Sequence, residues 1–214
     1  MSGNVPPVEG GPAGPAEPGA HARRRRLRSD ARRNIDALLE AAKEVFATTG
    51  VDAPAKRICD LAGVGVGTLY RHFPQRADLV MAVFRREVEA CAASAAELAA
   101  AYGPGAALER WLHRYTEFLA TKRGLAAALH RIDPEGTALS AYFRERFEPV
   151  LGSLLEGAAA AGEIGGDVTA RELLHAVANL CVPPPDESVG YSRRMVTLLV
   201  DGLRYRAAGD RERS

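Results

Sequence analysis

The sequence predicts an all-α protein of two small domains, on the evidence of its hydrophobic periodicity, its abundant alanine and its length. Apolar residues recur every three or four positions through long segments, and no stretch alternates apolar and polar residues for long. A chain of 214 residues, 47% of them hydrophobic, can supply a core to one small domain and to a second of ordinary size. We therefore expect a three-helix domain followed by a larger helical domain, with no sheet.

The N-terminal twenty residues are rich in Gly, Pro and Ala, so they cannot build a packed core and are expected to be disordered. We assign residues 1–28 to a basic, disordered arm. Its basic cluster follows the Pro/Gly stretch instead of preceding an apolar run, which argues against a secretory signal. No apolar run is long enough to span a membrane, so we expect a cytoplasmic protein without a membrane partner. The arginines of the arm are Arg23, Arg24, Arg25, Arg26 and Arg28.

The first helix is predicted from about Asp30 to Thr48, where Gly50 stops it. One apolar stripe runs along it and consists of Ile35, Leu38, Leu39, Ala42, Val45 and Phe46. A second helix opens after Asp52 and Ala53, because Pro54 is tolerated in a first helical turn.

Residues 58–73 are predicted to form a short helix, a glycine turn and a second short helix. Ala55, Ile58 and Ala62 lie at helical spacing, and Gly63 can adopt the left-handed conformation that ends a helix. The residues expected to face the core beyond the turn are Val64, Leu69 and Phe73. Those left for the outside are Val66, Thr68, Tyr70, Arg71 and His72. Such a polar, aromatic and imidazole surface is what a recognition helix offers to phosphates and base edges.

The run Gly-Thr-Leu-Tyr-Arg-His-Phe at residues 67–73 resembles the signature that ends the helix-turn-helix of the tetracycline-repressor (TetR) family. The resemblance implies a DNA-binding domain over residues 29–75, a helical regulatory and dimerisation domain over 76–209, and a tail over 210–214. Ala53 and Gly65 depart from the Ser or Thr frequent at those positions, so any phosphate contact made there is in doubt. The positions implied to contact DNA are Val66, Gly67, Thr68, Tyr70, Arg71, His72 and Arg76, with Lys56 as a further phosphate candidate.

Each of these residues also has a purely structural interpretation. A tight helical hairpin uses a glycine at its turn whatever its function. Tyr70 alone could be a half-buried packing residue, and His72 alone a solvated or capping histidine. The turn, the signature run and a basic context nevertheless occur together in the expected order, which favours DNA binding.

Charge is distributed unevenly along the chain, although the net charge is only +1. Residues 21–85 hold 13 Lys and Arg against 7 Asp and Glu, whereas residues 86–214 hold 15 against 18. Because phosphate neutralisation supplies much of the affinity of a DNA-binding protein, the basic N-terminal part supports the same function.

The remaining helices follow from their apolar patterns. Pro149 should kink or interrupt one of them, because proline lacks the amide that would bond back to Glu145. The expected helices are about 75–102, 108–119, 125–132, 143–158, 169–181 and 192–207, with a stiff proline linker at 183–185.

The family resemblance implies a homodimer through the last two helices, and a two-fold dimer reads a palindrome. The faces expected to meet are Leu173, Ala176, Val177 and Leu180 on one helix, and Met195, Leu198, Leu199, Gly202 and Tyr205 on the other. Part of that surface could equally be core within one chain.

A small-molecule effector is also implied, although the sequence does not identify it. The residues that could line its apolar cavity are Trp111, Tyr115, His130, Tyr142, Phe147, His175 and Asn179. Each could instead be ordinary core or surface. His175 and Asn179 lie one helical turn apart, but two such groups are too few for a metal site.

We therefore predict a sequence-specific transcription regulator, a homodimeric repressor released from a palindromic operator by a mainly hydrophobic ligand. The alternatives are an architectural protein that binds DNA without sequence preference, and a helical enzyme. The enzyme is disfavoured, because no nucleophile elbow, phosphate-binding glycine loop or metalloprotease motif occurs in the sequence. We expect no cofactor and no bound metal. Cys59, Cys91 and Cys181 are far apart in apolar patterns and are expected to be buried small hydrophobes, with redox sensing as the alternative.

Overall fold

The structure is a computed structural model that describes the backbone of residues 18–182 and 190–211 and the side chains of 29–182 and 190–205. Within these ranges every regular element is a helix, which confirms the all-α prediction. The helices are α1 Pro18–Thr49, α2 Ala55–Ala62, α3 Val66–His72, α4 Arg76–Ala101, α5 Pro104–Gly124, α6 Ala126–Ile132, α7 Thr137–Ala160, α8 Ala170–Leu180 and α9 Tyr191–Arg211.

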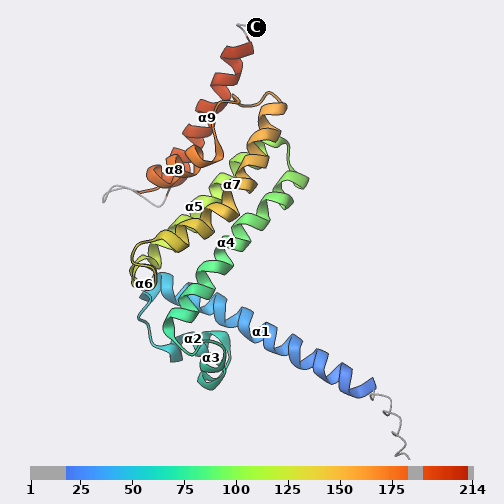
Figure 1. Ribbon diagram of the computed structural model, residues 1–214, viewed down its shortest axis with the longest axis vertical. Helices are drawn as coiled ribbons and strands as arrows, with labels where there is room; N and C mark the ends of the chain where they lie inside the picture. The colour runs from blue at the N-terminus through green and yellow to red at the C-terminus, as the bar shows by residue number, and fades with distance from the viewer. Residues whose placement is uncertain (1–17, 183–189, 212–214) are drawn as a thin grey trace, which may run out of the picture.

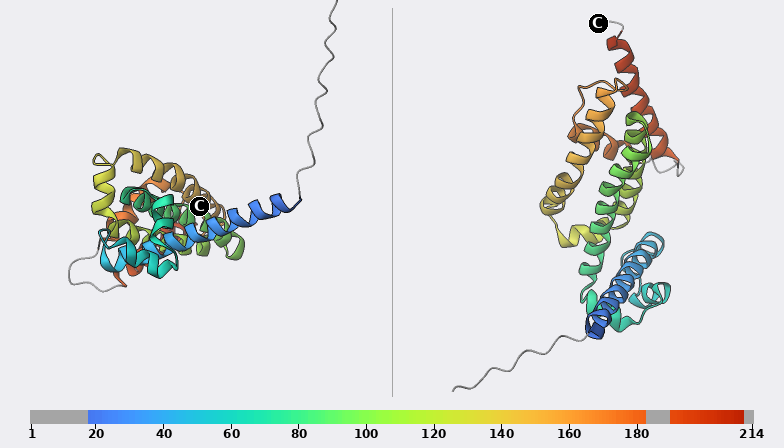
Figure 2. Two further views of the ribbon diagram at one scale, coloured as in Figure 1. Left: turned by 90° about the horizontal axis from the view of Figure 1, so that it is seen from below. Right: turned by 90° about the vertical axis from the view of Figure 1, so that its right-hand side faces the viewer.

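The molecule is elongated, with α2 and α3 at one end and α8 and α9 at the other (Figure 1). Helix α1 packs on α2 and α4, and its N-terminal half projects sideways from the body. Helix α4 runs from the α2/α3 end into the larger domain, where it lies beside α5 and α7; the right-hand view of Figure 2 shows the same arrangement.

An aromatic cluster forms the centre of the larger domain, between α5 and α7. Its rings lie 4.6–6.2 Å apart between centroids and meet in stacked, tilted and edge-on arrangements, a geometry that aromatic pairs favour. The members of the cluster are Trp111, Tyr115, Phe118, Phe143 and Phe147. This cluster packs α5 against α7.

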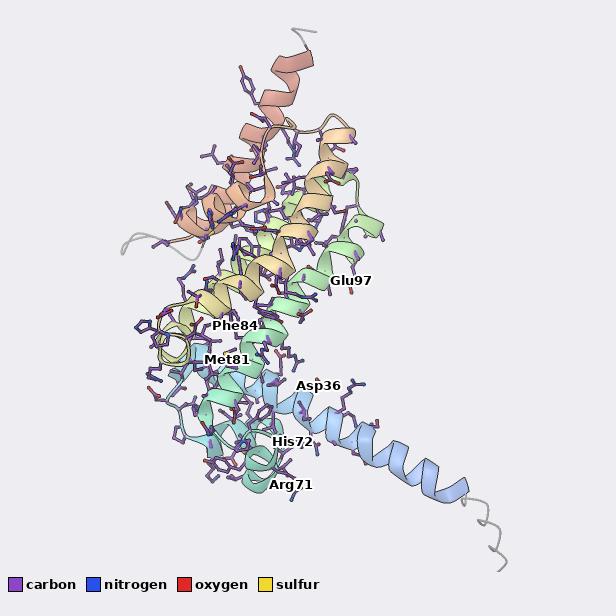
Figure 3. The ribbon with its side chains drawn as sticks, viewed as in Figure 1. Asp36, Arg71, His72, Met81, Phe84 and Glu97 are labelled. Atoms are coloured by element: carbon purple, nitrogen blue, oxygen red, sulfur yellow. The ribbon has the colours of Figure 1, made fainter. Side chains whose placement is uncertain are left out.

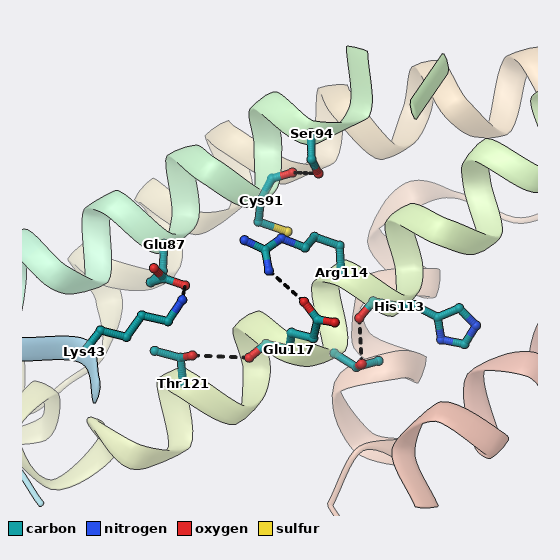
Figure 4. Close-up of polar contacts among 9 residues, drawn as sticks. Lys43, Glu87, Cys91, Ser94, His113, Arg114, Glu117 and Thr121 are labelled. Carbon is teal, nitrogen blue, oxygen red and sulfur yellow. Dashed lines mark hydrogen bonds and ion pairs between the residues drawn. The ribbon is translucent and has the colours of Figure 1, made fainter. Parts of the chain in front are cut away.

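Charged contacts join α1 of the smaller domain to α4. Lys43 Nζ lies 2.8 Å from a carboxylate oxygen of Glu87, which is the one buried charged residue among the described side chains (Figure 4). The preceding residue, Arg86, donates to the backbone carbonyl of Asp36 at 2.7 Å and lies 3.6 Å from the carboxylate of Glu40. Because a buried carboxylate needs its partner, the Lys43–Glu87 pair holds α1 and α4 in one register.

The first helix begins earlier than the sequence analysis expected. It starts at Pro18, not near Asp30, so residues 18–28 of the predicted arm are helical in the structure. The physical reason is that Ala, Arg and Leu dominate this stretch and all favour helix, while Pro18 suits a first turn. Residues 1–17, where disorder was also expected, lie outside the described residues, as does the proline linker at 183–185.

Helices α5 and α7 also differ from expectation. A helix was expected over about 108–119, but α5 already begins at Pro104, with Gly103 as the N-cap residue, and it ends at Gly124. Helix α7 begins at Thr137 and continues through Pro149 without interruption. A proline removes one backbone hydrogen bond, and the buried side chains of Phe147 and Leu151 hold the helix on both sides of it.

Candidate nucleic-acid interface and effector pocket

The turn between α2 and α3 is closed by Gly63 in the left-handed conformation, with φ 66° and ψ 31°. Its N–H donates to Asp60 O at 3.4 Å, and the N–H of Val64 donates to Cys59 O at 3.1 Å. This pair of bonds is the Schellman pattern that ends a helix, and a residue with a Cβ would be strained at this φ. The predicted glycine turn is confirmed.

Helix α3 is anchored on one side and open on the other. Leu69 and Phe73 are 3% and 9% exposed and hold it to the core, whereas Val66 and Tyr70 are 39% and 52% exposed. Gly67 and Arg71 are exposed too, and Thr68 and His72 are half-buried. Figure 3 places Arg71 and His72 at the end of the molecule farthest from α8 and α9. The buried and exposed sides predicted for α3 therefore match the structure. Val64, in the turn before α3, was expected to face the core but is only half-buried.

Helix α2 adds basic and apolar side chains to this end of the molecule. Lys56 is exposed and forms an ion pair with Asp60 at 2.6 Å, one turn along the same helix. Arg57 and Leu61 are exposed as well, and the sequence analysis did not single them out. Their closeness in the sequence to Lys56, a predicted phosphate contact, could have indicated that they belong to the same surface.

Arg76 differs from the other predicted DNA contacts, because its side chain already has partners inside the protein. It donates to Val51 O at 2.7 Å and to Ala53 O at 2.6 Å, and its guanidinium lies 4.9 Å from the centre of the Phe46 ring. Burial lowers its pKa, although an arginine stays charged. Arg76 thus ties the start of α4 to the loop that enters α2.

The predicted effector residues do not converge on one cavity. Trp111, Tyr115 and Phe147 belong to the closed aromatic cluster and are at most 1% exposed. The indole of Trp111 donates to Cys91 O at 3.0 Å, and the Tyr115 hydroxyl donates to Leu174 O at 3.4 Å. These rings fill the space that they were expected to line.

The other predicted effector residues are scattered. The Tyr142 hydroxyl donates to Glu89 at 2.7 Å, and burial followed by this hydrogen bond raises the pKa of Tyr142 to about 12. His175 and Asn179 are exposed on α8. His130 is the one of the seven that lines a pocket described below. Helical spacing could not reveal this, because it does not determine which faces of different helices meet.

A pocket of about 410 Å³ lies where α4, α5, α6, α7 and α8 converge. Lys122, Arg123 and His130 contribute nitrogen groups to it, and Asp133 and Glu135 contribute carboxylates. Its apolar lining includes Phe84, Leu119, Leu129, Leu139, Ala178 and Val182. The sequence analysis missed Lys122 and Arg123, which have no distinctive local motif.

A second hollow, about 540 Å³ in volume, lies between α8 and α9 and is almost wholly apolar. Leu173 and Val177, expected at the dimer face, are 2% and 0% exposed and belong to the core of one chain. Leu198 and Tyr205 are 65% and 81% exposed. The other lining residues from the predicted faces are Ala176, Leu180, Met195, Leu199 and Gly202. Part of the predicted dimer face is thus intrachain core, and the rest is open.

The three cysteines are buried and unpaired. Burial raises the pKa of each thiol, to about 12 for Cys91, which disfavours the reactive thiolate. Among the described residues, no group of three or more His, Cys, Asp or Glu is arranged to hold a metal ion. No helix within the same part of the chain is long and apolar enough to cross a membrane.

Comparison with known proteins finds matches for both the N-terminal and the C-terminal part of the chain. Residues 38–83 match the family model for bacterial regulatory proteins of the tetR family, and residues 103–205 match that for the SbtR-like transcriptional regulator C-terminal domain. An HTH-type transcriptional regulator of Staphylococcus aureus is 38% identical over 64 residues, which are 29% of this chain and 35% of the relative. The chain therefore matches about a third of the length of that curated relative.

Two crystal structures are similar over nearly their whole length. A TetR transcriptional regulator from Streptomyces coelicolor is 37% identical with a TM-score of 0.72, covering 79% of this chain and 98% of that one. A TetR transcription regulatory protein from Mycobacterium vanbaalenii is 35% identical with a TM-score of 0.68, covering 83% of this chain and 99% of that one.

Proposed function

The chain belongs to the TetR family of bacterial regulatory proteins and is a DNA-binding regulator of transcription; from this premise we propose that it is a homodimeric repressor of a palindromic operator, released by a small-molecule effector. The observation that carries the proposal is the exposed face of α3, held rigidly by Leu69 and Phe73. A rigid short helix with an open polar face can enter a major groove.

The α3 side chains divide by chemistry into base and phosphate contacts. Val66 can pack on a thymine methyl, and Thr68 can donate to a base or a phosphate. Tyr70, Arg71 and His72 offer a hydroxyl, a guanidinium and an imidazole to the phosphates of the DNA backbone. A Cβ added at Gly67 would meet no atom within 4 Å. Packing within the protein therefore does not require glycine there, whereas a close approach of the DNA backbone would.

Phosphate contacts from α2 complete this surface. Lys56 and Arg57 both lie in its first turn, and Lys56 can exchange its exposed partner Asp60 for a phosphate. We assign Arg76 a positioning role, because two of its five N–H donors bond to the carbonyls of Val51 and Ala53. The N–H groups of Arg76 that these two bonds leave over could still reach a phosphate.

A dimer through α8 and α9 would supply the second recognition helix. One short helix reads too few base pairs for useful specificity, whereas two helices related by a two-fold axis read both halves of a palindrome. The open apolar groove with Leu198 at its surface is the kind of face that a second copy covers.

Release by an effector requires a path from the larger domain to α3. Helix α6 contributes His130 to the pocket, and the next residue, Arg131, lies 3.4 Å from Asp52 in the loop before α2. Helix α4 contributes Phe84 to the pocket, while Arg76 at its start holds the same loop. An effector that binds one arrangement of α4 and α6 better than the other would shift operator occupancy by that difference in affinity.

Replacement of Tyr70 tests the DNA-reading surface. We expect Tyr70→Ala to lower affinity for an operator selected from random DNA at least about tenfold, since it removes a phosphate hydrogen bond and an aromatic contact. Fluorescence anisotropy at fixed salt, with circular dichroism to verify folding, measures this. Tyr102→Ala is the matched control, because Tyr102 is 43% exposed at the other end of α4.

Two results would count against this proposal. Wild-type operator affinity in a folded Tyr70→Ala protein would remove α3 as the reading helix. Equal binding of the wild-type protein to operator and to random DNA would instead favour the architectural alternative.

A further inference from the structure

The pocket between α4 and α8 is suited to a small organic molecule. Its volume of about 410 Å³ lies in the range of ligand sites, and α4, α5, α6, α7 and α8 supply its apolar walls. Phe84 and Leu129, at 1% and 5% exposed, show that this lining continues into the core. The occupant must therefore have an apolar body.

Lys122 is exposed and contributes an ammonium group to the rim of the pocket. The chain has three lysines, and the other two are paired, Lys43 with Glu87 and Lys56 with Asp60. No ion pair recorded between described residues includes Lys122, whose ammonium lies 5.3 Å from the centre of the Phe143 ring. Although Lys122 is exposed, the groups around its ammonium desolvate it in part and lower the pKa of Lys122. An ammonium in these surroundings would be stabilised by an anion.

Two of the other charged groups of the pocket form hydrogen bonds within the protein, and the remaining ones lie at its edge. Arg123 donates to Cys181 O at 2.9 Å and so holds the end of α8. A carboxylate oxygen of Asp133 accepts the N–H of Leu139 at 2.9 Å in the first turn of α7. Glu135 belongs to the turn between α6 and α7. The exposed imidazole of His130 can add a hydrogen bond to a bound polar group.

We propose that this pocket is the effector site and that it takes a monoanionic amphiphile, a molecule with an apolar body and one carboxylate that pairs with Lys122. The inference rests on the proposed function for its regulatory consequence, but binding itself does not depend on DNA. An alkyl chain and an aromatic ring both supply such an apolar body, and the probes below distinguish them.

Calorimetric titration of the full chain with four probes tests the proposal. Octanoate and 4-phenylbutanoate carry the carboxylate on the two kinds of apolar body, while octan-1-ol and octylamine replace it by a neutral and a cationic group. We expect at least one carboxylate to bind about tenfold tighter than octan-1-ol, the order expected for a charge-assisted hydrogen bond, and octylamine to bind weakest. Whichever carboxylate binds more tightly shows whether the apolar body of the ligand is an alkyl chain or an aromatic ring.

Lys122→Gln should abolish the preference for carboxylate over alcohol while leaving octan-1-ol affinity unchanged. Arg171→Gln, on the exposed part of α8 and outside the pocket lining, is the matched control and should keep the preference. Ala126→Trp, at an exposed position of the pocket rim, should block all probes without disturbing the core. Thermal unfolding verifies that each variant is folded.

Three results would overturn the ligand assignment: no carboxylate binding at millimolar concentration, octylamine or octan-1-ol binding at least as tightly, or an unchanged preference in Lys122→Gln. Failure of the proposed function has a different signature. A carboxylate that binds through Lys122 without lowering operator affinity would support this ligand class and contradict effector release.

Discussion

At the scale of single residues, Arg76 shows how one side chain can match a DNA-contact position and still serve the fold. Two of its donors bond to Val51 and Ala53, and its guanidinium covers Phe46. These contacts join three segments, α1, the loop before α2 and the start of α4. The position of the recognition helix therefore depends on a residue that need not touch DNA.

Arg76→Gln should lower the free energy of unfolding by about 1–3 kcal/mol, because two part-buried carbonyls lose a charged donor. Urea unfolding measures the change, and Arg57→Gln on the exposed side of α2 is the control expected to leave stability within about 0.5 kcal/mol. If Arg76→Gln weakened operator binding while its stability stayed that of the wild type, the positioning role would be wrong and a phosphate contact would replace it.

At the scale of elements, α9 has two different apolar sides along one helix. Val196 and Val200, at 0% and 1% exposed, pack into their own chain, whereas Leu198 is 65% exposed between them. A helix that buries one side and leaves a second apolar side open is typical of a subunit interface. The groove that it forms with α8 continues this open surface.

Leu198→Glu should dissociate the proposed dimer, because it places a charge in an apolar contact that would be repeated across the two-fold axis. Analytical ultracentrifugation at micromolar concentration should give a monomer, and operator affinity should fall by at least about tenfold. Asp201→Asn, exposed on the same helix and absent from the groove lining, should remain dimeric. A dimer that survives Leu198→Glu would place the subunit contact elsewhere.

At the scale of the whole molecule, basic charge and the reading helix lie at the same end. Helix α1 begins at Pro18, so the stretch with Arg23 to Arg26 continues the helix that packs against α2. Its N-terminal half projects from the body beside the α3 end (Figure 1). We propose that the arginines of this segment contact phosphates that flank the site of α3.

Deletion of residues 1–28 should weaken binding to all DNA and leave sequence preference nearly unchanged. Each lost phosphate contact should reduce the slope of log affinity against log salt by about 0.9. Anisotropy titrations over a salt series on operator and random duplexes measure both quantities. The shortened protein keeps the buried stripe that begins at Leu38, so it should fold. An unchanged salt slope would mean that the arginines do not contact DNA.

The sequence by itself determined the helical class, the glycine turn and the two sides of α3. These follow from local rules, namely apolar spacing, the left-handed conformation open to Gly63, and the alternation of Leu69 and Phe73 with exposed neighbours. The start of α1 was predicted wrongly, and of the two outcomes predicted at Pro149, a kink or an interruption, the interruption does not occur. At those points local signals competed, and helix propensity or packing prevailed.

Only the tertiary structure decided which predicted polar and aromatic residues are available. Trp111 and Tyr115 fill the core instead of lining a cavity, Arg76 is engaged by Val51 and Ala53, and Lys122 is brought to a pocket built from five helices. The physical reason is that side-chain spacing along one helix specifies a face, but not the helix that will cover it. Whether a group is satisfied, buried or free to bind depends on contacts between residues far apart in the chain.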